Sequence, residues 1–237
     1  MDRDLTEGNA VEKRPLPLIT GVLGGLGSRT AELLLEQGFE VFGVDNLDPG
    51  SAPAAHAKER LASLGALAGF HFLPLDLRAP DAGARIRDAL LPAVVLHAAG
   101  LEPWRRAPAD LDSLGGDLLR MAEAPVSLAS GDTLPLVLPL HEPLEEEDPR
   151  GGHPAWRELL AAESRLVERL ASSYPGEIRT AALPALWGRG QSPFSFPLHA
   201  LWQAASRLPS TLPPDRGAVR TLPLEAAARH LVELALT

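Results

Sequence analysis

The sequence contains no cysteine, which excludes disulfides, a thiol nucleophile and any metal site built on thiolates. It has only two lysines, Lys13 and Lys58, and a single tyrosine, Tyr174. Its two asparagines are Asn9 and Asn46. No apolar run approaches the roughly 18 residues that a membrane-spanning helix needs, so we expect no membrane partner. We also expect no metal site.

Basic residues are outnumbered, and the formal net charge is -9. Nonspecific affinity for nucleic acids comes from lysine and arginine, so this balance argues against a nucleic-acid partner. Residues 1–14 are polar, mixed in charge and without the apolar centre of a signal peptide. We expect them to form a flexible tail, a single domain to follow over residues 15–237, and a cytoplasmic location.

Short apolar runs alternate with segments of helical spacing along the rest of the chain. The predicted strands are Leu16–Thr20, Phe39–Asp45, Phe70–Leu75, Ala93–Ala98, Val126–Ser130 and Ile178–Leu183. The predicted helices are Ser28–Gln37, Ala54–Leu64, Asp81–Leu91, Leu111–Ala122, Trp156–Ser172, Leu198–Arg207 and Leu224–Leu236. This alternation predicts an α/β fold with a doubly wound parallel sheet of the Rossmann type. The segment Leu134–Pro154, rich in proline and acid, is interpreted as a surface loop.

The first strand runs into a glycine-rich turn, Thr20 to Ser28 (TGVLGGLGS), which opens the first helix. In Gly21-x-x-Gly24-x-x-Gly27, one glycine permits the tight turn, one lets the backbone approach a pyrophosphate, and one lets the helix pack on the strand. The pyrophosphate would then lie on the free amides and positive dipole end of the helix. This context predicts a dinucleotide-binding site.

Asp45 ends the second strand, where a carboxylate accepts hydrogen bonds from the adenosine ribose hydroxyls. It would repel a 2′-phosphate and therefore favours NAD(H). Arg29 or Lys58 could still accommodate NADP(H), so both cofactors stay open.

Several segments match one known family in order and spacing: the glycine turn, Val44 to Leu47 (VDNL), Asp76-Leu77 after the third strand, and His97-Ala98-Ala99 after the fourth. On these residues the chain resembles the short-chain dehydrogenases/reductases, and within them the extended, epimerase/dehydratase-like branch. The resemblance is strong up to residue 100 and patchy beyond it.

The resemblance implies a set of cofactor contacts. Asp76 would meet the adenine amino group beside Leu77, and His97 to Gly100 would pass beside the ribose and phosphates. The implied cofactor-binding residues are Thr20, Gly21, Gly24, Gly25, Leu26, Gly27, Asp45, Asn46, Asp76, Leu77, His97, Ala98, Ala99, Gly100 and Pro184. It also implies a cofactor-binding core over residues 15–183 and a reduced substrate or lid lobe over residues 184–237.

The family normally uses a Tyr-x-x-x-Lys pair, in which the lysine lowers the pKa of a phenol that exchanges a proton with the substrate. The matching positions here are Trp156, or Ala155, and Leu160, or Leu159. Indole does not exchange a proton near neutral pH, and leucine carries no charge. The single tyrosine and the two lysines lie elsewhere in the sequence, so the pair is absent.

One member of the usual catalytic set has a match in the chain. Ser130 ends the predicted fifth strand, where the family places a Ser or Thr that hydrogen-bonds a substrate carbonyl, and Thr133 is the alternative. A turn residue without chemistry explains Ser130 equally well. His199 and His153 are conceivable acids, although a surface position is the simpler interpretation for each.

Aromatic side chains in the second half can form a pocket for a flat ligand. The candidates are Trp156, Trp187, Trp104, Trp202, Phe194 and Phe196, and core packing is the simpler interpretation of each. From these we take Ser130, Trp156, Trp187, Phe194 and His199 as candidate substrate-binding residues.

These features resemble the atypical ketoreductases of antibiotic pathways. They predict an NAD(P)H-dependent ketoreductase acting on a polycyclic aromatic, polyketide-type ketone, with a proton supplied by a phenol of the substrate. Two alternatives stay open: an inactive NAD(P)-binding sensor or scaffold, and a nucleotide-sugar epimerase or dehydratase. The oligomeric state, monomer or homodimer, also stays open.

Overall fold

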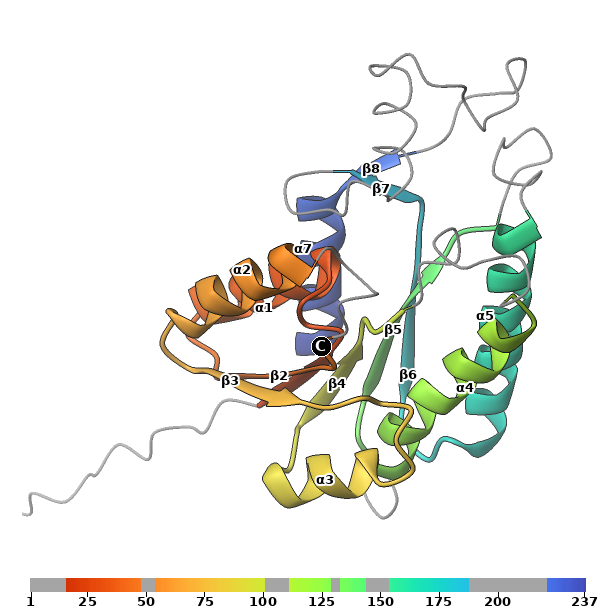
Figure 1. The fold of residues 1–237 in the computed structure, drawn as a ribbon, viewed down its shortest axis with the longest axis horizontal. Helices are drawn as coiled ribbons and strands as arrows, with labels where there is room; N and C mark the ends of the chain where they lie inside the picture. Colours follow the sequence, from red (N-terminus) through yellow and green to blue (C-terminus); the bar gives the residue numbers. More distant parts are fainter. Residues whose placement is uncertain (1–15, 48–53, 101–110, 129–132, 144–153, 188–220) are drawn as a thin grey trace, which may run out of the picture.

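The computed structural model describes residues 16–47, 54–100, 111–128, 133–143, 154–187 and 221–237. Six parallel strands form one sheet in the order β3-β2-β1-β4-β5-β6, which confirms the predicted doubly wound α/β fold (Figure 1). The strands are β1 (Pro17–Thr20), β2 (Val41–Asp45), β3 (Phe70–Pro74), β4 (Val94–His97), β5 (Leu136–His141) and β6 (Ile178–Leu183).

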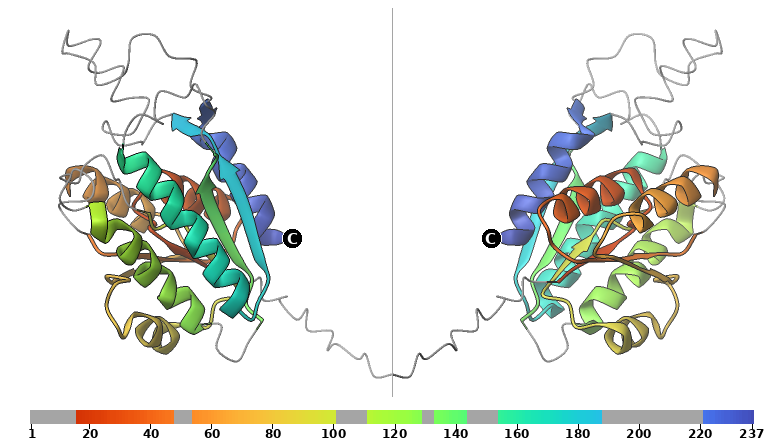
Figure 2. Two further views of the ribbon diagram at one scale, coloured as in Figure 1. Left: turned by 90° about the vertical axis from the view of Figure 1, so that its right-hand side faces the viewer. Right: turned by 90° about the vertical axis from the view of Figure 1, so that its left-hand side faces the viewer.

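Helices cover both faces of the sheet, as the two side views of Figure 2 show. On one face lie α1 (Gly25–Glu36), α2 (Ala54–Gly65) and α7 (Leu224–Leu236), and on the other lie α3 (Ala82–Ala89), α4 (Leu111–Leu128) and α5 (Pro154–Ser173). Each face has its own apolar core, one built around Leu34 and Leu231 and the other around Leu136 and Leu159. The central strands β1 and β4 are wholly buried between the two cores, which explains their uninterrupted apolar sequences.

The strand register brings the chemically important strand ends to one edge of the sheet. Thr20 at the end of β1 is paired with His97 at the end of β4. His141 at the end of β5 is paired with Leu183 at the end of β6. Because all six strands are parallel, these carboxyl ends share the edge at which doubly wound folds bind their ligands.

The fifth strand is not where the sequence analysis placed it. Val126–Leu128 belong to α4, which continues through Pro125, and residues 129–132 lie outside the described part. The strand is Leu136–His141 instead, so the strand prediction was wrong. The surface-loop prediction for Leu134–Pro154 was wrong over these same residues, and its residues 144–153 lie outside the described part. Pro139 fits this strand because β4 pairs only as far as Val137, beyond which a missing backbone donor is tolerated.

The chain returns to the first face of the sheet after β6. A two-stranded parallel sheet joins β7 (Ala185–Trp187) to β8 (Thr221–Pro223), and α7 then packs against α1. Both strands of this small sheet lie beyond the carboxyl edge of the large one (Figure 1). The predicted helix Leu198–Arg207 lies outside the described residues. Among the described helices, none is both long and apolar enough to cross a bilayer.

Candidate functional site

Two glycines of the turn after β1 have no room for a side chain. Gly21 has a φ of +69°, and a Cβ there would lie 2.6 Å from the Cα of Ala99. A Cβ on Gly27 would lie 2.3 Å from the carbonyl oxygen of Gly21. The turn therefore keeps the tight cradle that a pyrophosphate needs, as its glycine spacing predicts.

Helix α1 begins in this turn without the usual capping groups. Gly24 occupies the N-cap position and makes no side-chain hydrogen bond, and the first turn of the helix carries no acidic residue. The partial positive charge of the helix end is thus left for a ligand. These features fit the diphosphate of a dinucleotide.

The carboxylate of Asp45 is fixed above the same turn. Its Oδ2 accepts a hydrogen bond from the backbone N–H of Leu23 at 2.9 Å, and its Oδ1 accepts one from Asn46 at 2.9 Å. Burial raises the pKa of Asp45 above its usual value, while these backbone donors oppose the shift. A carboxylate held in this way retains lone pairs for the ribose hydroxyls.

Two arginines near the predicted cofactor residues are already bonded to acids. Arg78 donates hydrogen bonds to both carboxylate oxygens of Asp76, and this contact lowers the pKa of that carboxyl. Arg29, a candidate for a 2′-phosphate, is bonded to Glu225 of α7 and to Glu32 of its own helix. Lys58, the other candidate, is exposed on α2.

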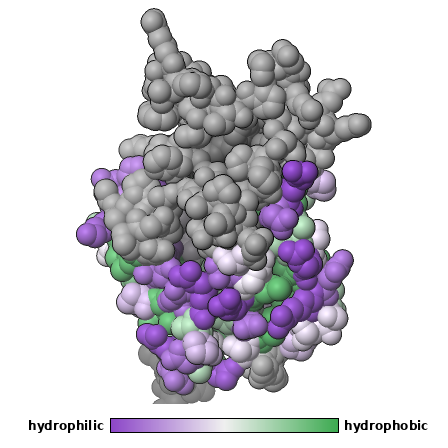
Figure 3. Space-filling view, turned by 45° about the vertical axis from the view of Figure 1, so that its right-hand side comes forward, coloured by the Kyte–Doolittle hydropathy of each residue, from purple (hydrophilic) through white to green (hydrophobic). Residues whose placement is uncertain are grey.

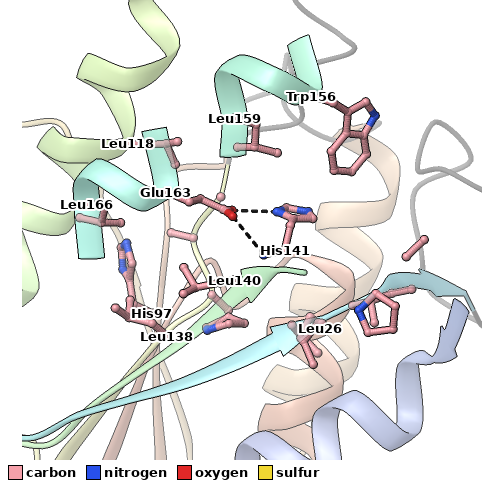
Figure 4. Close-up of a pocket in the computed structure, with 18 residues that line it drawn as sticks. Leu26, His97, Leu118, Leu138, Leu140, His141, Trp156, Leu159, Glu163 and Leu166 are labelled. Atoms are coloured by element: carbon pink, nitrogen blue, oxygen red, sulfur yellow. Dashed lines mark hydrogen bonds and ion pairs between the residues drawn. The ribbon is translucent and has the colours of Figure 1, made fainter. Parts of the chain in front are cut away.

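A cavity of about 180 Å³ lies at the carboxyl edge of the sheet (Figure 4). It exceeds the roughly 150 Å³ that holds one benzene ring. Leu26 of the glycine turn lines it, together with the residues that end or follow β4, β5 and β6. The lining residues are Leu26, His97, Ala98, Ala99, Gly100, Leu118, Leu138, Pro139, Leu140, His141, Trp156, Leu159, Glu163, Leu166, Leu183, Pro184, Ala185 and Leu186.

Three of these residues can titrate: His97, His141 and Glu163. His97 is buried, and its Nδ1 lies 2.8 Å from the hydroxyl of Thr20. Burial lowers the pKa of His97 to about 4, so the ring stays neutral near pH 7. His97 therefore ties the end of β4 to the end of β1 through Thr20 but is poorly suited to donating protons.

The positions that match the family's Tyr-x-x-x-Lys pair lie on α5. Trp156 in its first turn is buried and lines the cavity, whereas Leu160 is not among the lining residues. Tyr174 lies just past the other end of α5, and its hydroxyl donates to the carbonyl of Leu134 at 2.6 Å. Burial raises the pKa of Tyr174 to about 12. This phenol is a structural group and does not replace the missing one.

The His141–Glu163 pair was not among the residues predicted from the sequence. The Nδ1 of His141 lies 2.7 Å from Oε1 of Glu163, and the backbone N–H of His141 donates to Oε2 at 3.0 Å. The His141 ring also meets the indole of Trp156 edge to face, with centroids 5.1 Å apart. The sequence holds a signal for His141: β5 (LVLPLH) is an apolar run that ends in a histidine, as β4 (VVLH) is.

Several candidate residues fall beyond the described ranges: Ser130, His153, Phe194, Phe196, His199, Trp104 and Trp202. Ser130 does not end β5, because His141 does. Thr133 is described and exposed, three residues before the strand. Trp187 is 48% exposed at the end of β7 and is not among the lining residues. In this part of the chain, Trp156 is the candidate aromatic that the structure brings to the cavity.

The face formed by α4 and α5 is mixed in character. Figure 3 shows hydrophilic side chains over much of this side, with apolar ones scattered among them. Arg157, Glu158, Arg165, Glu168 and Arg169 of α5 are exposed.

Comparisons with known protein sequences match the part of the chain that contains the glycine turn. Residues 17–114 match the model of the NAD dependent epimerase/dehydratase family. A UDP-glucose 4-epimerase from Cyamopsis tetragonoloba is 43% identical over 86 residues, which cover 36% of this chain and 24% of that protein. The resemblance noted in the sequence is thus confirmed for the segment from β1 to the beginning of α4.

Solved structures extend the likeness of fold to most of the chain. UDP-glucuronic acid 4-epimerase from Bacillus cereus, solved with UDP-glucuronic acid and NAD, has a TM-score of 0.71 at 18% identity. The match covers 92% of this chain and 72% of that one. A dTDP-glucose 4,6-dehydratase double mutant from Streptomyces venezuelae, with NAD bound, has a TM-score of 0.71 at 17% identity and covers 93% and 72%.

Proposed function

We propose that the protein binds NAD(H) and transfers a hydride between it and a carbon that carries a hydroxyl or keto group. One observation carries the proposal: a single cavity joins Leu26 of the glycine turn to the ends of β4, β5 and β6. A ligand carbon in this cavity lies beside the edge at which the fold holds its cofactor. Of the three titratable side chains that line the cavity, His141 is the most exposed, at 33%.

The described residues fit the dinucleotide in three places. The amides at the beginning of α1 would hold the pyrophosphate, Asp45 the adenosine ribose, and Asp76 with Leu77 the adenine. When bound, NAD(H) supplies the hydride-exchanging carbon C4 of its nicotinamide. Leu26 and Pro184 would exclude water beside that ring, since both line the cavity. The Asp45 carboxylate supports NAD(H) over NADP(H).

Nucleotide sugars are the substrate class that the comparisons favour. The matching relative is a UDP-glucose 4-epimerase, and the structural neighbours include an epimerase and a dehydratase of nucleotide sugars. The sequence match spans only a quarter of that epimerase, so the likeness supports a substrate class and no particular sugar. On this interpretation the chain performs the redox step of an epimerase or dehydratase.

A polycyclic aromatic ketone is a second candidate, supported by the lining of the cavity. Apart from His97, His141 and Glu163, every lining residue is apolar, which suits a flat apolar ring better than a sugar. A third candidate, an NAD(P)-binding protein without turnover, is supported by the missing Tyr-x-x-x-Lys pair.

Turnover assays separate the three candidates. The protein is incubated with NAD⁺ and either UDP-glucose or UDP-glucuronic acid, and in parallel with NADH and a ketone flanked by a phenolic hydroxyl. A new sugar epimer, or a change in the absorbance of the reduced nicotinamide, is the expected result in one arm. Saturable NADH binding with no conversion in any arm would overturn the proposal in favour of the third candidate.

A further inference from the structure

We infer that His141 is the catalytic proton donor and acceptor of this site and that Glu163 positions it. The inference deepens the proposed function and rests on it, because a proton has to move whenever a hydride is transferred. It assigns to a histidine at the end of β5 the task for which α5 has neither tyrosine nor lysine.

A proton carrier has to lie in the cavity, and His141 does. It is the last residue of β5, in register with Leu183, and it lines the cavity together with Pro184, which follows β6. Its side chain is 33% exposed, so a substrate oxygen can reach it. A proton carrier at this point lies between the cofactor edge of the sheet and the first turn of α5 (Figure 4).

Glu163 fixes both the orientation and the tautomer of the imidazole. Its two oxygens contact His141 at two points, the ring Nδ1 at 2.7 Å and the backbone N–H at 3.0 Å. A carboxylate only accepts, so Nδ1 is the donor and the ring presents Nε2 to its other side. The Glu163 side chain is only 13% exposed, and a buried carboxylate requires such a partner. Orientation of a histidine by a carboxylate is a recurrent way to prepare a catalytic base.

Helix spacing explains why the pair faces the cavity. Trp156, Leu159 and Glu163 are three and four residues apart, so they lie on one face of α5. Trp156 holds the ring of His141 from the side by its edge-to-face contact. The carboxylate thus lies two turns along the helix from Trp156, with both oxygens on His141, and it acts through the ring of that residue.

The other titratable groups nearby do not compete for this role. His97 is bonded to Thr20 and stays neutral near pH 7. Glu163 is engaged at both oxygens, and Glu142, the next residue along the chain, is not among the cavity lining. Of the lining groups that the structure describes, His141 is left as the proton carrier.

The step balances in both directions. In reduction the carbonyl carbon gains the hydride supplied by the dinucleotide, and the carbon–oxygen π electrons move onto oxygen. That oxygen takes the proton from Nε2–H of the imidazolium, so the ketone becomes an alcohol, the dinucleotide is oxidised, and the imidazole regains its proton from water. In oxidation Nε2 accepts the proton of the substrate hydroxyl while the carbon gives its hydride to the oxidised dinucleotide, so the alcohol becomes a ketone.

Three variants test the inference with the whole chain. His141→Gln removes the proton carrier, Glu163→Gln removes the positioning charge, and Glu163→Asp is the conservative rescue. His71→Gln on β3 is the matched control, because that histidine is exposed and far from the cavity lining. Turnover uses whichever probe the parent protein converts, UDP-glucose with NAD⁺ or the phenol-flanked ketone with NADH.

We expect His141→Gln to lower the rate by about 100-fold or more while NADH binding is unchanged, since general acid–base groups contribute on that scale. Glu163→Gln should lower kcat more than it changes KM and should alter the pH profile, and Glu163→Asp should recover part of the rate. Parental turnover by His141→Gln would overturn the inference.

A second readout needs no turnover. In a variant with Trp104, Trp187 and Trp202 replaced by Phe, the emission of Trp156 reports on the imidazole that contacts it edge to face. We expect this emission to change with pH, and we expect the change to be abolished by His141→Gln and retained in His71→Gln. If the parent converts neither probe, the proposed function fails. Trp156 fluorescence that does not respond to pH then also overturns the inference about His141.

Discussion

Buried His97 predicts a pH-dependent stability. The unfolded chain takes up a proton on this ring near pH 6.5, but the folded protein does so only near pH 4. Between these values the unfolded state binds more protons, so stability falls as pH drops, by up to about 3 kcal/mol. Urea unfolding at several pH values should show this slope in the parent and a weaker one in His97→Asn. An equal slope in both proteins would contradict it, and His71→Gln is the control.

Gly27→Ala tests the cradle of the glycine turn. Its Cβ would lie 2.3 Å from the carbonyl oxygen of Gly21, so the turn has to move. We expect NADH affinity to fall by at least about 10-fold, or about 1.4 kcal/mol. Gly65→Ala at the end of α2 is the matched control, because nothing lies within 4 Å of the added carbon. Equal NADH affinity in the two variants, measured by fluorescence titration, would contradict this account of the glycine turn.

The residues of the site differ in how far the sequence reveals them. The glycines and Asp45 were predictable because a pyrophosphate and a ribose demand particular residue types at fixed spacing. His141 ends an apolar run, but a histidine followed by Glu142 and Pro143 also fits an acidic loop, and it was interpreted as part of one. Its role depends on Glu163, and no local pattern links two residues on different elements.

At the scale of elements, the pattern of strands and helices predicted most of the sheet. Strands β1 to β4 and β6 lie where apolar runs indicated them, because strands buried on both faces need continuous apolar sequence. Strand β5 was misplaced for two reasons. A proline usually ends a helix, but α4 continues past Pro125 to the buried Leu128. Pro139 suggested a loop, although it lies beyond the stretch paired with β4.

Helix α7 is predicted to stabilise the cofactor half directly. It packs against α1, and Arg29 of α1 is bonded to Glu225 at its beginning. Leu231 is fully buried there, so Leu231→Ala should cost about 2–5 kcal/mol of unfolding free energy. Leu236→Ala on the same helix is the control, since Leu236 is 39% exposed. Similar losses for both variants in chemical denaturation would show that α7 is not seated as described.

At the scale of the whole molecule, a glycine turn and sheet of ordinary form are joined to a proposed proton-transfer site of unusual composition. The fold resembles that of NAD-binding epimerases and dehydratases over more than nine-tenths of the chain. The first turn of α5 carries Trp156 where that family has its tyrosine, and the ion pair of β5 and α5 faces the same cavity. The division into a core over 15–183 and a lobe over 184–237 stays a prediction, and within it α7 packs on the core sheet.

Binding of the dinucleotide is measured by NADH titration of the intact chain, followed by nicotinamide fluorescence. We expect saturable binding with one NADH per chain, weaker binding of NADPH because Asp45 opposes a 2′-phosphate, and a loss of affinity in Gly27→Ala. Absence of saturable NADH binding, or equal binding by parent and Gly27→Ala, would contradict this expectation.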